Sequence, residues 1–213
     1  MHKEMDLFGY SKTEKELTME NAQQLKGLNI AFEFISKEEE RELLSNIDTM
    51  EWLQDLKRRV QHYGYKYDYK ARLIDPSFYI GEMPTWLTFL TDRLQQQNLI
   101  SFRPDQAIIN EYVDDQGIAA HIDCEPCFGD TIVSISLAGQ CVMNFQKEAN
   151  TKEQDKVSLF IPSRTLIVMT NESRFDWYHG ISPRRSDKFN GQTFKRGRRV
   201  SITFRKVLME HEG

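Results

Sequence analysis

Short runs of β-forming residues, separated by turns, fill the second half of the chain and limit the folds open to it. Turn signals lie between the runs, for example Asp114–Gly117 and Ala138-Gly139. Many short, closely spaced strands are typical of an all-β sandwich, barrel or jelly roll. We therefore predict a mainly β fold with flanking helices. The expected strands are Ala107–Val113, Thr131–Leu137, Cys141–Phe145, Val157–Ile161, Thr165–Met169, Trp177–Ile181 and Val200–Val207.

The first half of the chain carries helical signals instead. Ser36 and Glu39 form a capping box ahead of apolar residues at helical spacing, and Pro84 opens a second such segment. Residues 1–27 are polar with little periodicity, which indicates an extension that is partly helical or disordered. We expect a single domain with three parts: the extension at 1–27, helices packed on the core at 28–103, and the β core at 104–213.

Composition narrows the class of protein. The 213 residues can bury a sizeable core without disulfide or metal staples. No apolar run approaches the roughly 18 residues that a membrane span needs, and the first ten residues lack the apolar core of a secretory signal. We expect a monomer that does not bind membranes and is cytoplasmic or, in a eukaryote, nuclear. The net charge of −4 argues at first sight against a nucleic-acid partner.

Three cysteines are present, and two of them, Cys124 and Cys127, form a C-x-x-C. An odd count without a signal peptide is typical of a reducing, intracellular setting. Cys141 alone does not complete a structural zinc site with this pair. The pair is therefore either incidental to its loop, or sensitive to redox state or able to scavenge a metal.

Metal-ligating residue types recur at strand spacing around His121. On a strand, His121 and Asp123 point to the same side because side chains alternate. An imidazole and a carboxylate on one face are two ligands of a 2-His-1-carboxylate triad, which binds Fe(II) and leaves positions open. The third ligand must be a distant histidine. His179 remains, because His2 and His211 are terminal and His62 lies in a basic segment.

Two arginines flank an alternating segment near the C-terminus. Arg199, Ser201 and Arg205 share one face of the expected strand, while the residues between them are largely apolar. If that face lines the interior, the arginines suit a small dianion, because a guanidinium can bind a carboxylate in a bidentate way. The alternative is a solvent-exposed face. The two Cα atoms would lie about 20 Å apart, so both side chains would have to converge on one ligand.

Taken together, these motifs resemble one family. The ordered set of N-x-Y at Asn110, H-x-D at His121, a distal His179 and an R-x-x-x-x-x-R from Arg199 to Arg205 resembles the AlkB family of Fe(II)- and 2-oxoglutarate-dependent dioxygenases. The segments 132–137 and 171–174 also look like the family's core, and the resemblance covers residues 58–207. It implies a double-stranded β-helix, the jelly roll of cupin-like proteins, and an oxidoreductase.

The resemblance also implies a ligand set. His121, Asp123 and His179 would hold Fe(II), with 2-oxoglutarate and O₂ as co-substrates. Arg205 would bind the C1 carboxylate end of 2-oxoglutarate, and Arg199 the far carboxylate together with Asn110 and Tyr112. Ser201, which stands where some members have Asn, is assigned to the same co-substrate.

The reaction implied by the family is oxidative demethylation of N-alkylated bases in DNA or RNA, with release of formaldehyde, succinate and CO₂. Repair members of the family resemble this chain in having an acidic residue at the position of Glu125. A carboxylate there would suit the cationic bases 1-methyladenine and 3-methylcytosine. The alternative is a solvated loop residue. The target base must leave the stack, so the expected partner is single-stranded or presents a flipped base.

Residues 58–65 look like the family's nucleotide-recognition lid. For each aromatic side chain here, the alternative is a place in the core. The residues that we assign to substrate binding, besides Glu125, are Arg58, Arg59, Tyr63, Tyr65 and Trp86, with Tyr67 as a further aromatic candidate.

Charge is distributed unevenly along the chain, which qualifies the argument from net charge. Residues 57–72 hold six Lys or Arg against one acidic residue, and residues 184–206 hold nine against one. Two such stretches could bind phosphates around the site. The alternative is a surface on which folding mixes the charges.

Two other functions remain open from the sequence. The segment 58–64 and the C-terminal core also look similar to the AlkB-like branch that hydroxylates a tRNA wobble modification, although Glu125 argues against it. A non-catalytic jelly-roll module that binds a metal or a partner is a third reading, against which the complete triad and the arginine pair argue.

Overall fold

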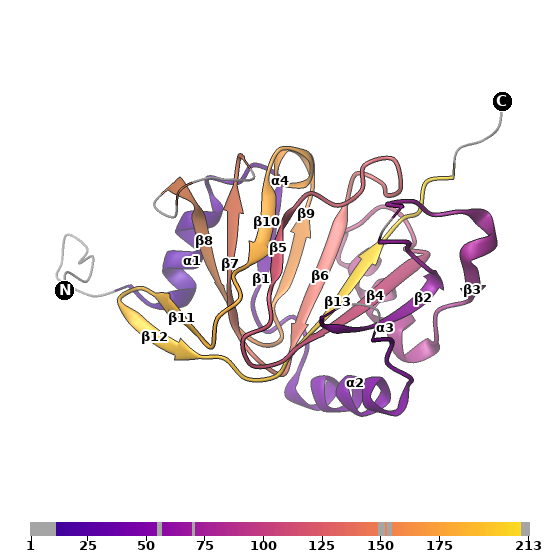
Figure 1. Cartoon of the computed structure of the whole chain (residues 1–213), viewed down its shortest axis with the longest axis horizontal. Coiled ribbons are helices and arrows are strands. Elements are labelled where there is room, and N and C mark those ends of the chain that lie inside the picture. Colours follow the sequence, from indigo (N-terminus) through magenta and orange to yellow (C-terminus); the bar gives the residue numbers. More distant parts are fainter. Residues whose placement is uncertain (1–11, 55–56, 70, 149–151, 153–154, 210–213) are drawn as a thin grey trace.

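The structure is a computed structural model that describes residues 12–54, 57–69, 71–148, 152 and 155–209. His2, His211 and Lys70 lie outside the described residues. The described strands form a large sheet, a smaller sheet and a hairpin, and every pairing is antiparallel (Figure 1).

The large sheet has seven strands in the order β1-β9-β6-β13-β4-β2-β3. In its centre, β13 pairs with β4 on one side and with β6 on the other. The bounds are β1 Leu28–Ala31, β2 Arg59–Tyr65, β3 Tyr79–Gly81, β4 Gln106–Tyr112, β6 Ile132–Leu137, β9 Leu166–Met169 and β13 Arg199–Arg205.

The smaller sheet has four strands in the order β5-β10-β7-β8, and a separate hairpin follows it in the chain. The hairpin turns at Asn190 and Gly191, both at positive φ, which two-residue hairpin turns require. The bounds are β5 Ile118–His121, β7 Cys141–Gln146, β8 Val157–Ile161, β10 Tyr178–Ile181, and for the hairpin β11 Ser186–Phe189 and β12 Gln192–Lys195.

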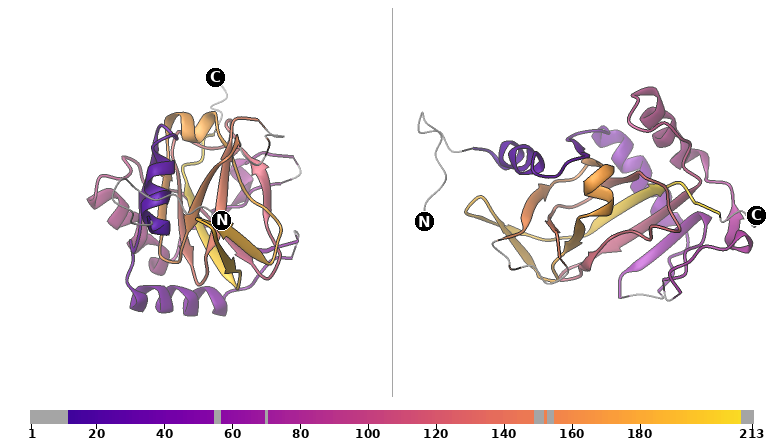
Figure 2. Two further views of the ribbon diagram at one scale, coloured as in Figure 1. Left: turned by 90° about the vertical axis from the view of Figure 1, so that its left-hand side faces the viewer. Right: turned by 90° about the horizontal axis from the view of Figure 1, so that it is seen from above.

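Helices lie along one side of the strands in the view from above (Figure 2). Ser36 and Glu39 form the expected capping box of α2, Lys37–Thr49, and Pro84 is the N-cap of α3, Thr85–Gln96. The other helical elements are α1 Glu14–Ala22, α4 Asn171–Phe175 and the short 3₁₀ helix η1 Pro76–Phe78. None of the helices within the described ranges is long and apolar enough to cross a membrane.

The two faces of the large sheet serve different purposes, and strand alternation separates them. Val200, Ile202 and Phe204 of β13 point toward α2 and α3 and belong to one apolar core. The polar residues that alternate with them face the smaller sheet, where a second core lies between the sheets. The central strand therefore presents arginines to the interior between the sheets, as one of the two alternatives from the sequence required.

The mainly β prediction is confirmed, and each of the seven expected strands is present with ends within two residues of those expected. The described part of the segment 1–27 contains a helix, which agrees with the partly helical extension expected from the sequence. Its helix α1 packs against β8, and the buried Thr18 exchanges hydrogen bonds with the backbone of Phe160. The residues that α1 buries are Thr18 and Ala22, so no apolar stripe marks this helix in the sequence.

Candidate iron and 2-oxoglutarate site

Two neighbouring strands of the smaller sheet bring the histidines together. β5 and β10 are antiparallel, and their register places His121 directly opposite His179. Their ring centroids are 4.5 Å apart. Asp123 follows two residues after His121, and the potential ligand atoms of all three residues lie within 4.8 Å of one another. Two histidines and one carboxylate so placed form a facial triad of the kind that binds Fe(II).

The hydrogen bond of His121 and the burial of His179 suit metal binding. The Nδ1 of His121 lies 2.9 Å from the carbonyl oxygen of Ala119, which can only accept, so the lone pair of this ring is on Nε2. Burial and, to a smaller extent, the neighbouring His121 lower the pKa of His179 to about 3. A neutral imidazole is the form that ligates a metal.

Asp123 is held by Arg205 through one carboxylate oxygen. Arg205 donates from Nε at 2.8 Å and from Nη2 at 2.6 Å to Oδ1. The other oxygen, Oδ2, lies 3.5 Å from Nε2 of His179 and so faces the histidines. Burial alone would raise the pKa of Asp123, but Arg205 and the two histidines hold it well below its usual range. One oxygen of an ionised carboxylate is therefore directed to the metal position.

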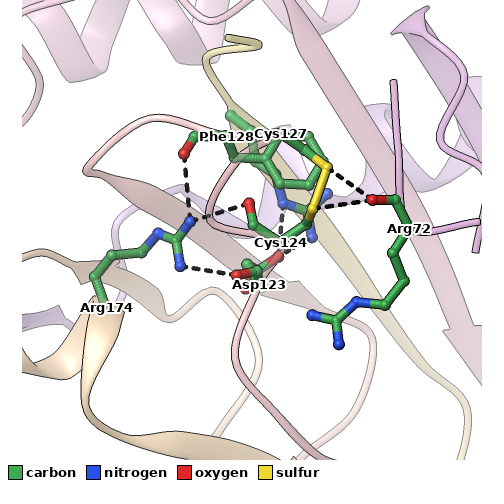
Figure 3. Close-up of a disulfide and its surroundings, with 7 residues drawn as sticks. Arg72, Asp123, Cys124, Cys127, Phe128 and Arg174 are labelled. Carbon is green, nitrogen blue, oxygen red and sulfur yellow. Dashed lines mark hydrogen bonds and ion pairs between the residues drawn. A yellow bond between two sulfur atoms is a disulfide. The ribbon is translucent and has the colours of Figure 1, made fainter. Parts of the chain in front are cut away.

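Arg174 of α4 fixes the loop that follows Asp123 (Figure 3). Its side chain is 2% exposed and donates to the carbonyl oxygens of Asp123, Cys124, Phe128 and Gly129. No ion pair joins Arg174 to a carboxylate among the residues that the structure describes. Burying a guanidinium that bonds only to backbone carbonyls costs free energy. The charge of Arg174 also contributes to the positive potential around Asp123, which lowers the pKa of that carboxyl.

Cys124 and Cys127 form a disulfide that closes the same loop, and Cys141 is free and buried (Figure 3). The two Sγ atoms lie 3.2 and 3.3 Å from the carbonyl oxygen of Arg72, in the segment between β2 and η1. The pair therefore packs against that segment, rather than standing free in a loop. The two cysteines are thus bonded to each other, and redox sensitivity of the pair stays a prediction.

A cavity of about 340 Å³ extends from the triad between the two sheets. Its lining includes both arginines of β13, so their side chains reach one space despite the length of the strand. Among the described residues, the charged side chains that line it are Arg58, Arg72, Arg199 and Arg205 against one carboxylate, that of Asp123. Such an excess of positive charge suits an anionic ligand.

Arg199 lies at the far end of this cavity, and one nitrogen of its guanidinium has no hydrogen-bond partner. Its Nη2 donates to Oγ of Ser136 at 2.7 Å, and its Cζ lies 5.5 Å from the ring centre of Tyr112. Its buried Nε has no hydrogen-bond partner. An unpaired buried guanidinium nitrogen costs about 1–3 kcal/mol, which a bound carboxylate would recover.

Tyr112 and Asn110, on β4, lie beside Arg199 of β13. The register pairs Arg199 with Tyr112 and Ser201 with Asn110. Burial raises the pKa of Tyr112, so its hydroxyl keeps its proton and can donate to a carboxylate. Ser201 also lines the cavity, and its Oγ lies 3.0 Å from Oγ of Ser134. Arg199, Asn110 and Tyr112 therefore offer donors for the far carboxylate of 2-oxoglutarate, while Arg205 lies at the metal end.

The residues assigned to substrate binding separate into two groups. Arg58 lines the cavity, but Arg59 points to the opposite face and pairs with Glu111. Tyr63 shares that opposite face, where its hydroxyl donates to Gln61 and its ring meets Trp86 in the helical core. Strand alternation explains why neighbours in sequence part in this way. Tyr63 and Trp86 are thus core residues in the structure.

Tyr65 and Glu125 also lie outside the cavity lining. Tyr65 packs on Tyr79 with ring centres 5.1 Å apart, and Glu125 is exposed in the turn after Asp123. In their place the cavity is lined by Tyr67, Tyr69 and Arg72, all from the irregular segment after β2. Tyr67 was a candidate from the sequence. No periodic pattern marked Tyr69 and Arg72, because their segment is not a regular strand.

Much of the basic character near the C-terminus is neutralised by folding. Arg184 and Arg196 pair with the buried Asp187. Arg198 pairs with Asp48 and Glu111, and Lys206 with Asp105. With Arg199 and Arg205 in the cavity, the described basic residues of 184–206 that join no ion pair on the surface are Arg185, Lys188 and Lys195.

Comparisons with known proteins agree with this geometry. A model of the 2OG-Fe(II) oxygenase superfamily matches residues 11–205. An uncharacterised protein of Acanthamoeba polyphaga mimivirus is 33% identical over 92% of this chain and 92% of its own length. The tRNA (carboxymethyluridine(34)-5-O)-methyltransferase ALKBH8 of Mus musculus is 37% identical over 85% of this chain, which spans only 30% of that protein.

Two further comparisons concern an enzyme and a fold. The DNA N6-methyl adenine demethylase of Caenorhabditis elegans is 28% identical over 96% of this chain and 68% of its own length. The solved structure of OsALKBH1 superposes with a TM-score of 0.65 at 14% identity, covering 84% of this chain and 96% of that one. The chain therefore belongs to the 2OG-Fe(II) oxygenase superfamily, as an AlkB-family dioxygenase that uses Fe(II), 2-oxoglutarate and O₂.

Proposed function

We propose that this dioxygenase oxidises an alkyl group carried by an uncharged base of a nucleic acid. Bound Fe(II) and 2-oxoglutarate supply the activation of O₂ that C–H oxidation needs. The names of the ALKBH8 and N6-methyladenine relatives support a nucleic-acid substrate. The charged residues that line the cavity favour a base without positive charge.

The observation that carries the proposal is the shortage of carboxylates around the cavity. Asp123 is the only acidic residue in its described lining, and its Oδ1 is already bound to Arg205. Glu125, the carboxylate expected to read a cationic base, is exposed and absent from that lining. With Arg205 paired to Asp123 and Arg199 assigned to 2-oxoglutarate, the described lining offers a cationic 1-methyladenine or 3-methylcytosine no free carboxylate, and Arg72 on the same wall would repel it.

Uncharged bases meet no such penalty. The uracil ring of carboxymethyluridine and the base N6-methyladenine, which occur in the names of two relatives, carry no positive charge at physiological pH. Tyr67 and Tyr69 provide aromatic side chains at the cavity wall against which a flipped base can stack. Burial raises the pKa of both tyrosines, so their hydroxyls stay protonated and add no negative charge.

Two reactions fit this proposal. The first is hydroxylation of a substituent on a tRNA wobble uridine, for which identity to ALKBH8 is the supporting observation. The second is removal of the methyl group of N6-methyladenine, in which the hydroxymethyl product breaks down to formaldehyde and free adenine. The earlier expectation of repair of cationic bases is the case against which both are tested.

The test uses matched substrates. Oligonucleotides of one sequence that contain N6-methyladenine, 1-methyladenine or 3-methylcytosine, and a tRNA pool, are incubated with enzyme, Fe(II) and 2-oxoglutarate and analysed by mass spectrometry. We expect loss of the N6-methyl group, or one added oxygen on a tRNA uridine, and none of either with His179→Ala. Faster demethylation of the cationic bases would refute the proposal, as would turnover of 2-oxoglutarate with every nucleic acid left unchanged.

A further inference from the structure

We infer that Arg58 serves the co-substrate and not the phosphates of the nucleic acid: it orients the amide of Asn110 toward 2-oxoglutarate. Sequence reasoning placed Arg58 with the nucleotide-binding residues because it lies in the segment 58–65, which looks like the family's nucleotide-recognition lid, and within the basic stretch 57–72. The inference depends on the use of 2-oxoglutarate by this dioxygenase and is independent of which base the enzyme oxidises.

Backbone register places Arg58 at the co-substrate end of the cavity. β2 pairs Arg59 with Glu111 and Val60 with Asn110. One step further along the same ladder, Arg58 stands beside Tyr112, which is paired on its other side with Arg199. Arg58 therefore approaches the same end of β4 that carries the donors for the far carboxylate.

The contacts of Arg58 agree with the register. Its Nε donates to Oδ1 of Asn110 at 2.7 Å. Its Cζ lies 5.9 Å from the ring centre of Tyr112 and 5.8 Å from that of Tyr69, within the range of a cation–π interaction. None of the described carboxylates is in an ion pair with Arg58, so no carboxylate competes with the amide oxygen of Asn110 for its donors.

The hydrogen bond to Asn110 has a chemical consequence. A guanidinium can only donate, so it must be met by the amide oxygen of Asn110 and never by the amide nitrogen. The Nδ2 of Asn110, which can only donate, is then the atom left for a ligand. A carboxylate can only accept, so this orientation is the one that binds 2-oxoglutarate. Without Arg58, the amide is free to turn its oxygen toward the carboxylate, where the two would repel.

Arg58 is thus a positioning residue, and its effect should appear in co-substrate binding without turnover. The probe is 2-oxoglutarate titrated calorimetrically into the Mn(II)-loaded full chain. We expect Arg58→Gln to weaken binding about tenfold, since a hydrogen bond involving a charged group is typically worth that much. The matched control, Lys57→Gln, removes the same charge from the preceding exposed residue and should change 2-oxoglutarate affinity less than about twofold.

A double-mutant cycle asks whether Arg58 acts through Asn110. If it does, Arg58→Gln combined with Asn110→Ala should bind 2-oxoglutarate as Asn110→Ala alone does, because coupled residues are not additive. Fully additive losses would overturn the inference, since they mean that Arg58 acts on the ligand independently of the amide. Thermal unfolding midpoints of all variants identify any that fail to fold, and Arg58→Lys, which keeps the charge and a donor, should recover part of the affinity.

The competing role is measured on the same proteins. Binding of a fluorescein-labelled single-stranded oligonucleotide is followed by anisotropy for wild type, Arg58→Gln and Lys57→Gln. We expect the two variants to bind the oligonucleotide equally well. If Arg58→Gln instead loses oligonucleotide affinity well beyond Lys57→Gln while 2-oxoglutarate binding is unchanged, Arg58 is a phosphate contact and the inference is wrong.

Discussion

At the metal end of the cavity Arg205 lies against Asp123, whereas at the far end Arg199 contacts only neutral groups. Both arginines come from the same face of β13 and both are buried. Arg205 has the carboxylate of Asp123 and the amide oxygen of Gln106 as acceptors. Arg199 has a hydroxyl, an aromatic ring and one buried nitrogen without a partner.

This difference separates an arginine that already has a carboxylate partner from one that has none among the described residues. The charge of Arg205 is used to hold a metal ligand in its ionised form, so its partner is already part of the fold. The charge of Arg199 is compensated by no described side chain, and its natural partner is a ligand. One strand thus organises the metal at one end and the anionic co-substrate at the other, and each end can be disabled separately.

The largest effect is expected at the metal end. Asp123→Ala removes a metal ligand and leaves the buried Arg205 without its carboxylate partner. Breaking a buried pair in this way costs about 3–5 kcal/mol of the free energy of unfolding. We expect no measurable Mn(II) binding by calorimetry and a large loss of stability in urea. Asp130→Ala, at an exposed carboxylate of the same loop, serves as control; Mn(II) affinity retained in Asp123→Ala would contradict the account.

The far end should respond in the opposite way. Arg199→Met removes the donor for the far carboxylate, and two charge-assisted hydrogen bonds make a loss of about 100-fold in 2-oxoglutarate affinity reasonable. Mn(II) affinity should be unchanged, and stability should hold, because the unpaired Nε disappears with the side chain. Calorimetry and urea unfolding of the same preparation measure these quantities. An equal loss of Mn(II) binding would show that the two ends are not separable.

Arg174 tests whether the metal end depends on its loop as well as its ligands. Arg174→Met breaks the hydrogen bonds to four carbonyls of the loop, and such supporting contacts typically change metal affinity about tenfold or more. We expect weaker Mn(II) binding but normal 2-oxoglutarate affinity once the site is saturated with metal. Normal Mn(II) affinity in this variant would limit Arg174 to a role in folding.

The smallest effect is expected at Ser201. Its hydroxyl already has a partner in Ser134, and its neighbours supply stronger donors to the far carboxylate. Ser201→Ala should change 2-oxoglutarate affinity less than about fivefold, the worth of one neutral hydrogen bond. A loss as large as that of Arg199→Met would mean that the far end is organised around Ser201 instead.

The sequence predicted the central strand well because its alternation is local. A period of two along residues 199–205 separates the arginines from the core residues whatever the rest of the fold does. The metal ligands could be anticipated from residue type and spacing. The histidines come together because β5 pairs with β10. The family resemblance implied that proximity, but the local pattern alone could not predict it.

The residues that line the cavity on the side of β2 were harder to predict, for a physical reason. Arg58 and Arg59 are adjacent and equally basic, and only the sheet decides which of them faces the cavity. Tyr63 lies four residues after Arg59, on the same face of β2, and is therefore in the core. Arg174 was recognised only as part of a family-like segment, because its partners are backbone carbonyls at least 45 residues away, which leave no trace in side-chain patterns.

The most direct test of the difference between the two ends compares two ligands that differ only at the far end. 2-Oxoglutarate and 2-oxobutanoate share the metal-binding oxoacid group, but 2-oxobutanoate lacks the far carboxylate. Titrated into Mn(II)-loaded wild type, 2-oxoglutarate should bind about 100-fold more tightly. Arg199→Met should reduce that preference to less than about fivefold while leaving the affinity for 2-oxobutanoate unchanged. A preference that survives in Arg199→Met, or an equal loss of both ligands, would contradict the account.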